Sequence, residues 1–157
     1  MKFVKKLDSF LLEHVITKRP PNFTIPYSVN KTYMQRWFII PHNRIFNIYL
    51  HQYTEPDPDY TLHDHPWFSV SLILFSGYVE QTILYGGRFK YKELRQGDLH
   101  FMSPWHTHRI CQVRCGICRT LFITGPILRK WGFHNSITGW VNSKTHSARQ
   151  KRIGKEF

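Results

Sequence analysis

Two short stretches of the chain place pairs of histidines one residue apart. LHDHPW contains His63 and His65, and the later stretch GDLHFMSPWHTHRI contains His106 and His108. In an extended strand, residues i and i+2 lie on the same face, with their Cα atoms about 7 Å apart. Each pair could therefore direct two imidazoles into one space, and neutral imidazole is a common ligand of iron, zinc, nickel and copper. The pattern indicates a metal centre; histidines on a solvated loop are the alternative.

The elements that would position these histidines are mostly short strands. Apolar residues recur at helical spacing over 2–17, which predicts one N-terminal helix. The prolines of RPPNFTIP then force extended chain, and turn signals follow at Gly77, Gly97 and in YGGR at 85–88. We expect strands near 36–40, 45–52, 68–76, 78–85, 88–94, 98–102, 108–114, 118–124 and 128–133. This pattern predicts an all-β sandwich or barrel preceded by a short helix.

The two histidine stretches resemble the two sequence motifs of the cupins, which are small jelly-roll β-barrels, or double-stranded β-helices. The matching residues are His63, His65 and Gly77 in the first motif, and Gly97, Asp98, Pro104 and His108 in the second. The resemblance implies a jelly roll over residues 36–133. It also implies that His63, His65 and His108 hold a metal inside the barrel.

The resemblance also bears on the ligand set. Cupins usually carry a glutamate four or five residues after the second histidine of HxH, and Ser69 and Val70 stand at those positions in this chain. The implied centre therefore has three histidines, as in the thiol dioxygenases, with His106 as the rival of His108 for the third position. Asp64 falls on the opposite strand face, where we expect it to orient a loop or a histidine. LHDHPW, THRI and TLFITGP…WGF are also similar to uncharacterised phage-encoded cupin-like proteins.

Three neutral imidazoles leave a divalent ion with its full charge and with open coordination positions, which favours an anionic co-ligand. We expect Fe(II), with Zn, Ni and Mn as alternatives, in a dioxygenase-type oxidoreductase that acts on a small anionic substrate. A non-enzymatic cupin that binds or sequesters a nucleotide or phosphosugar is the second hypothesis.

Other side chains are candidates for the same cavity. Trp67, Ser69 and Ser71 follow the histidines with the same parity, so the strand would direct them to the same face. Tyr49 and His51 share a face of an earlier strand and could close the cavity from the other side. Packing in the core is the alternative for the aromatic residues, and the two serines could hydrogen-bond a ligand.

The chain is strongly basic. Among its 157 residues, 22 are Lys or Arg and 10 are Asp or Glu, which gives a formal net charge of +12 and favours anionic partners. The stretch KTHSARQKRIGK carries much of this excess. We therefore expect a single domain over 1–143 and a basic, flexible tail over 144–157, and a tail that binds nucleic acid is the third hypothesis.

The sequence also bears on location and assembly. No apolar run reaches the length of about 18 residues that a membrane-spanning helix requires, so we expect no membrane partner. The odd number of cysteines, three, favours a reducing cytoplasm, that of the host cell if a phage encodes the protein. A homodimer is an open expectation.

Overall fold

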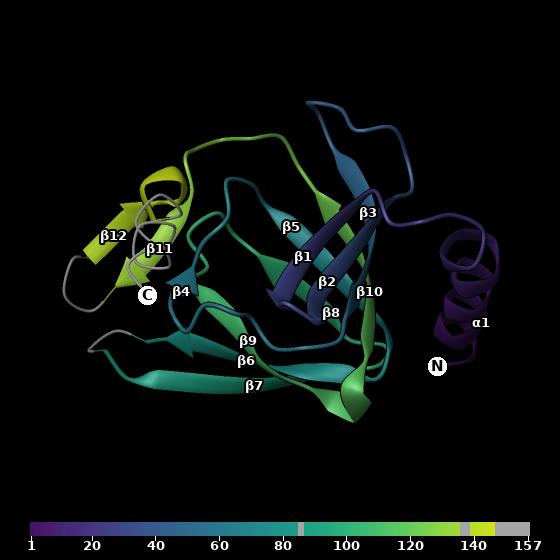
Figure 1. Ribbon diagram of the computed structural model, residues 1–157. Coiled ribbons are helices and arrows are strands. Elements are labelled where there is room, and N and C mark those ends of the chain that lie inside the picture. Colours follow the sequence, from purple (N-terminus) through teal and green to yellow (C-terminus); the bar gives the residue numbers. More distant parts are fainter. Residues whose placement is uncertain (85–86, 136–138, 147–157) are drawn as a thin grey trace.

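Two antiparallel sheets face each other in the computed structural model of the protein, which describes residues 1–84, 87–135 and 139–146 (Figure 1). The strands are β1 (Phe23–Ser28), β2 (Lys31–Phe38), β3 (Asn47–Tyr53), β4 (Leu62–His63), β5 (Ser69–Phe75), β6 (Gly77–Ile83), β7 (Phe89–Arg95), β8 (Leu99–Met102), β9 (His108–Val113), β10 (Cys118–Thr124), β11 (Gly132–Asn135) and β12 (Gly139–Asn142). The first sheet has the order β1-β2-β3-β10-β5-β8, and the second has the order β12-β11-β4-β9-β6-β7. Strands that are distant in sequence therefore lie side by side.

Burial alternates along the central strands, because one face of each sheet points into the barrel. In β5, Ser69, Ser71 and Ile73 are buried, whereas Val70 and Leu72 between them are only half-buried. One cluster of buried side chains joins the two sheets inside the barrel: Ile73, Tyr78, Leu94, Ile110 and Cys118. The all-β jelly roll that the sequence predicts is confirmed.

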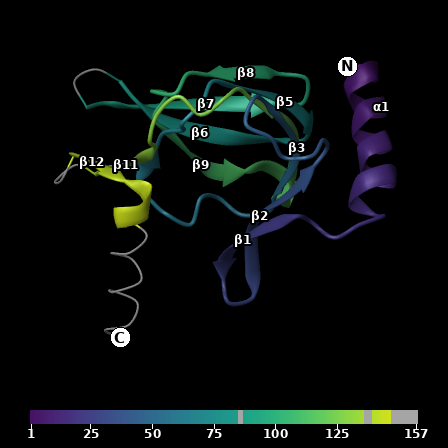
Figure 2. The same cartoon turned by 90° about the horizontal axis from the view of Figure 1, so that it is seen from above.

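A helix covers the outer face of the first sheet at one end of the molecule (Figure 2). It consists of α1 (Lys2–Leu11), which continues into a π-helical turn over Leu12–Ile16, in agreement with the predicted helix over 2–17. The apolar residues between helix and sheet are Val4, Leu11, Trp37, Leu50 and Leu74. Asp8 adds a buried ion pair by accepting two hydrogen bonds from Arg119 of β10, at 2.7 and 2.6 Å.

Several boundaries differ from the predicted ones. Gly77 was expected in a turn but begins β6, and Ser76 takes the turn position with a φ of 58°. The reason is the close approach of β7, since a Cβ on Gly77 would lie 2.1 Å from the Leu94 carbonyl oxygen. The short strands β1, β4 and β12 were not predicted. In the predicted YGGR hairpin, residues 85–86 lie outside the described part, although β6 and β7 pair as the hairpin requires.

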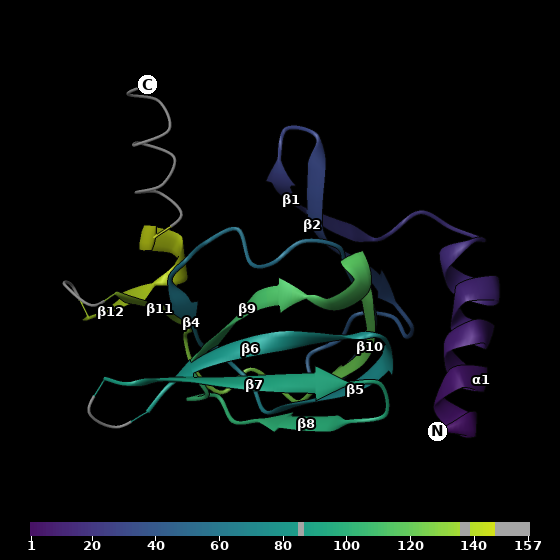
Figure 3. The same ribbon diagram turned by 90° about the horizontal axis from the view of Figure 1, so that it is seen from below.

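The C-terminal strands β11 and β12 lie at the end of the barrel away from α1 (Figure 3). A helical turn follows over 143–146, and within it His146 hydrogen-bonds to Asp59 and stacks on Phe133 with ring centroids 3.9 Å apart. The first residues of the predicted tail therefore contact the domain. The remainder of that tail, 147–157, lies outside the described residues. Within the described residues, no helix has the length and apolar character needed to cross a membrane.

Candidate metal centre

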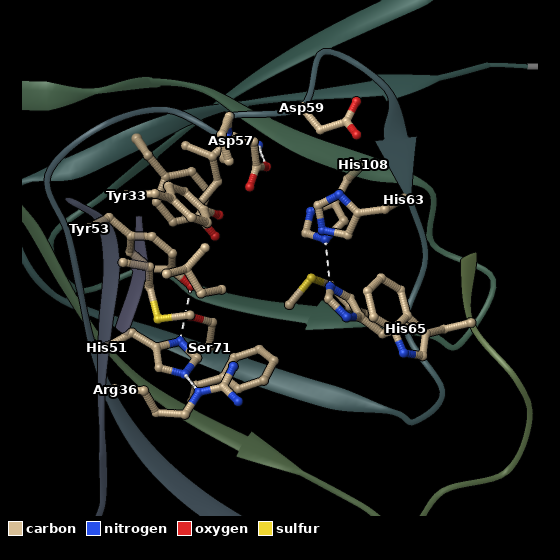
Figure 4. A pocket seen from close by; sticks show the side chains of 18 of the residues that line it. Tyr33, Arg36, His51, Tyr53, Asp57, Asp59, His63, His65, Ser71 and His108 are labelled. Atoms are coloured by element: carbon tan, nitrogen blue, oxygen red, sulfur yellow. Dashed lines mark hydrogen bonds between the residues drawn. The ribbon is translucent and has the colours of Figure 1, made fainter. Parts of the chain in front are cut away.

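Three histidines meet inside the barrel where β4 and β9 pair. His63 of β4 lies directly opposite His108 of β9, and His65 follows two residues later on the same side of the chain. Each ring offers a nitrogen within 4.8 Å of the other two, and the Nε2 atoms of His65 and His108 are 2.9 Å apart (Figure 4). We call these three residues the histidine triad. It unites the HxH pair with one member of the second predicted pair.

Burial favours the neutral form of two members of the triad, His63 and His65. Burial lowers the pKa of His63 to about 4. Burial, and secondly the neighbouring His108, lowers the pKa of His65 well below its usual value. A metal ion needs the unprotonated ring nitrogen, so these histidines would not have to lose a proton to bind one at neutral pH. The donor set therefore fits a divalent metal ion that prefers nitrogen ligands.

Glu80 of β6, which no sequence motif indicated, orients the third member of the triad. The side chain of Glu80 is 1% exposed, and its Oε1 atom lies 2.6 Å from His108 Nδ1. The carboxylate can only accept, so His108 carries its proton on Nδ1 and directs the lone pair of Nε2 toward His63 and His65. Carboxylate contacts of this kind orient metal-binding histidines and raise their basicity. No spacing in the sequence links Glu80 to the HxH motif, because the contact depends on the pairing of β6 with β9.

His106 does not join the triad. It lies in a second cluster with Glu80 and His100, whose ligand atoms are also within 4.8 Å of one another. His106 Nε2 and His108 Nδ1 lie 3.2 and 2.6 Å from Glu80 Oε1, and the two ring centroids are 5.1 Å apart. Of the two alternatives for the third position, the structure places His108 beside His63 and His65.

The triad opens into a cavity of about 510 Å³ between the two sheets. Its walls are largely aromatic and include Phe23, Tyr33, Tyr53, Phe122, Trp131 and Phe133. Trp67, Ser71 and His51 line the cavity, as the strand parity predicted. Ser69 is buried but is not among the lining residues, and neither is Tyr49.

One cationic side chain, Arg36 of β2, lines this cavity together with the triad, and no sequence motif indicated it either. Arg36 Nε donates a hydrogen bond of 2.8 Å to His51 Nε2, so His51 carries its proton on Nδ1, which lies 3.0 Å from the Tyr53 hydroxyl. The guanidinium also stacks 4.6 Å above the centre of the Tyr49 ring. In Figure 4, Arg36 and His51 lie on one side of the cavity and the triad on another.

Asp64, between the two histidines of HxH, faces away from the cavity. Its carboxylate accepts hydrogen bonds from the Gly132 backbone (2.8 Å), Arg129 (2.9 Å) and Trp140 (2.9 Å), and it lies 3.1 Å from His134 Nε2. Asp64 thus attaches the C-terminal strands β11 and β12 to the strand that carries the triad. The contacts of Asp64 with β11 and β12 and the contact of Glu80 with His108 thus support the triad from outside the cavity.

Comparison with known structures places the fold among the cupins. The chain is similar to an uncharacterised conserved protein with a double-stranded β-helix domain from Klebsiella pneumoniae, with 12% identity, 75% of this chain and 90% of that chain covered, and a TM-score of 0.51. A cupin 2 conserved barrel domain protein from Rhodopseudomonas palustris gives 14% identity, coverage of 85% and 86%, and a TM-score of 0.53. The protein thus has the cupin double-stranded β-helix fold, with a histidine-rich candidate metal site.

Other comparisons add nothing to this assignment. No protein-family model matches the sequence, and no curated protein matches it. Neither of these two proteins is described as a phage protein, so the resemblance to phage-encoded proteins gains no support from them. Identities this low establish the fold alone, and function has to be argued from the site.

Proposed function

We propose that the protein is a metal-dependent oxidoreductase of the non-haem iron dioxygenase type, acting on a small anionic substrate. The observation that carries this proposal is the opening of three histidine side chains into a largely aromatic cavity that also contains Arg36. His63, His65 and His108 would hold the metal. Bound Fe(II) would supply redox chemistry and open ligand positions, which protein side chains lack. Zn, Ni and Mn remain alternative metals for the same three nitrogens.

The charge of the site supports an anionic substrate. Three neutral ligands leave the charge of a divalent ion uncompensated, so an anionic group of the substrate would be favoured beside the triad. Arg36 uses Nε for its hydrogen bond to His51, and the described residues provide no acceptor for its two Nη groups. Those groups can form paired hydrogen bonds to a carboxylate. Arg36 would thus orient the substrate while the aromatic walls exclude water from it.

The same lining residues favour a small carboxylate or thiolate over a nucleotide or phosphosugar. Arg36 is the only Lys or Arg among the residues that line the cavity, all of which are described. Asp57 and Asp59 also line it and would repel a group of high negative charge. The body of the ligand would contact mainly apolar and aromatic side chains. A substrate with one anionic group and an apolar portion therefore suits the cavity best.

The test uses the full chain without an affinity tag, stripped with a chelator and reloaded with Fe(II) in the absence of oxygen. Iron content and oxygen uptake are then measured with a panel of small carboxylates and thiols. We expect iron binding at the triad and oxygen uptake with at least one compound, and we expect His63→Ala/His65→Ala to lose the oxygen uptake and the iron bound at the triad. His42→Ala, which changes an exposed histidine outside the cavity, is the matched control and should behave as the parent.

Two results would contradict the proposal in different ways. Unchanged iron content in the double variant would show that the triad is not the metal site. Iron binding at the triad together with tight ligand binding, but without oxygen uptake for any compound, would support the non-enzymatic binding protein instead.

A further inference from the structure

We propose that the chain holds a second divalent metal ion, of the zinc class, between Glu80, His100 and His106. This site is distinct from the histidine triad and does not depend on the function proposed for it. Its remaining ligand position would face a separate surface cavity and would be suited to an oxyanion.

Three different elements bring the ligands together. Glu80 comes from β6, His100 from β8 of the opposite sheet, and His106 from the loop before β9. The Nε2 atoms of His100 and His106 lie 2.9 and 3.2 Å from Glu80 Oε1, and one ligand atom of each residue lies within 4.8 Å of the others. Such separations are those of donor atoms that share one ion, because metal–nitrogen and metal–oxygen bonds of about 2.0–2.2 Å hold neighbouring donors roughly 3 Å apart.

A second observation concerns the other oxygen of the same carboxylate. Glu80 Oε2 is buried and finds no hydrogen-bond partner among the residues that the structure describes, and the Glu80 side chain is only 1% exposed. Among the described residues, the ion-pair contacts of Glu80 are made by imidazoles alone, without any Lys or Arg. A buried polar atom without a hydrogen-bond partner is unfavourable, and buried carboxylates are normally paired or coordinate a metal. A cation bound by Glu80 would supply the partner that Oε2 lacks.

The cluster has its own opening, which the triad does not share. Glu80, His100 and His106 line a cavity of about 370 Å³ whose other lining residues include Lys90 and Lys92, and none of these five lines the cavity of the triad. Two histidines and one glutamate form the protein ligand set of several catalytic zinc sites, which keep one position open. The two lysines beside that position would attract a phosphate or carboxylate as the fourth ligand.

One hydrogen bond links the two sites. His108 directs Nε2 to the triad, and its Nδ1 lies 2.6 Å from Glu80 Oε1. Glu80 Oε1, which lies near both histidines of the second cluster, would bind the ion and also accept the hydrogen bond of His108, and Oε2 could bind the same ion. A substitution of Glu80 would therefore affect both sites, and the two histidines of the second cluster are the better test.

The test measures the number of metal ions bound per chain in the parent protein and in His63→Ala/His65→Ala. Tag-free, chelator-stripped protein is titrated with Zn²⁺ and, separately, with Co²⁺, whose visible absorption reports the ligand geometry; bound metal is measured after equilibrium dialysis. The parent should bind about two ions per chain, and His63→Ala/His65→Ala should retain about one. Adding His100→Gln and His106→Gln to that double variant should remove the last ion and its Co²⁺ absorption. His42→Gln, at an exposed position, is the control and should change nothing.

The outcomes separate this proposal from the proposed function. If the triad binds no metal, the parent binds one ion, and that ion should still be lost on changing His100 and His106. The proposal is overturned if His63→Ala/His65→Ala binds no ion, or if an ion remains after both second-cluster histidines are changed. Circular dichroism tests whether each variant folds. If the variant with both His100→Gln and His106→Gln does not fold, His106→Gln alone is added to His63→Ala/His65→Ala, because His106 is the more exposed of the two ligands. This single change must then weaken Zn²⁺ binding at least tenfold.

Discussion

The ion pair between Asp8 and Arg119 attaches α1 to the first sheet, and its removal should destabilise the whole domain. The two residues are 6% and 7% exposed, and both oxygens of Asp8 accept hydrogen bonds from the guanidinium. In Asp8→Ala, the Arg119 guanidinium would stay buried without its carboxylate partner. It would keep the cation–π contact with Phe75, whose ring centre lies 4.4 Å away.

The expected loss of folding stability in Asp8→Ala follows from the charge of Arg119 that is left unpaired. Removal of one partner from a buried ion pair costs about 3–5 kcal/mol. Because the Phe75 ring remains and water could enter the space left by the Asp8 carboxylate, we expect the lower end, about 3 kcal/mol. For a chain of this size, that loss lowers the melting temperature by roughly 6–12 °C.

Urea unfolding followed by circular dichroism measures the change, with two further variants as references. Glu55→Ala removes an exposed ion pair with Lys31 and should leave the midpoint almost unchanged, because solvent screens such pairs. Asp8→Leu/Arg119→Met leaves no buried charge between the helix and the first sheet, so it should recover most of the lost stability. The reasoning is refuted if Asp8→Ala is as stable as Glu55→Ala, or if the double variant is no more stable than Asp8→Ala.

Three further predictions concern other parts of the barrel. Glu80→Gln should weaken Fe(II) binding at the triad by about 10- to 100-fold, because His108 loses its charged acceptor; competition with a chelator of known affinity measures this, and unchanged affinity would contradict it. Burial, and secondly Arg36, lowers the pKa of His51 well below its usual value, so the unfolded chain gains a proton near pH 6.5 that the folded chain does not. The parent should therefore lose about 1.4 kcal/mol more stability than His51→Gln between about pH 7.5 and 5.5, and equal losses in urea titrations would count against the assignment. Gly77→Ala should cost about 1–3 kcal/mol because its Cβ would meet a β7 carbonyl oxygen at 2.1 Å, whereas the control Gly125→Ala, with 3.7 Å to the nearest atom, should cost less in the same assay.

Local patterns in the sequence were sufficient for the type of fold. The helical spacing at the N-terminus and the short strand-like runs between turn residues predicted the helix and most strands, because burial alternates with the period of the local backbone. The exceptions had non-local causes. The two-residue strand β4 exists because β9 and β11 lie on either side of it, and Gly77 is needed in a strand because β7 approaches closely.

The candidate metal site likewise has features that local sequence patterns predict and features that depend on non-local contacts. The sequence by itself determined that His63 and His65 share a face and that a later histidine pair could complete a ligand set, since both inferences need only the period of a strand. The choice of His108, and the approach of Glu80 and Arg36, were decided by the tertiary structure. These contacts depend on which strands pair and in what register, including the bulge between Val79 and Glu80 in the pairing of β6 with β9. Such pairing is a property of the whole barrel, because each strand's register is set by the residues it must bury against strands far away in the chain.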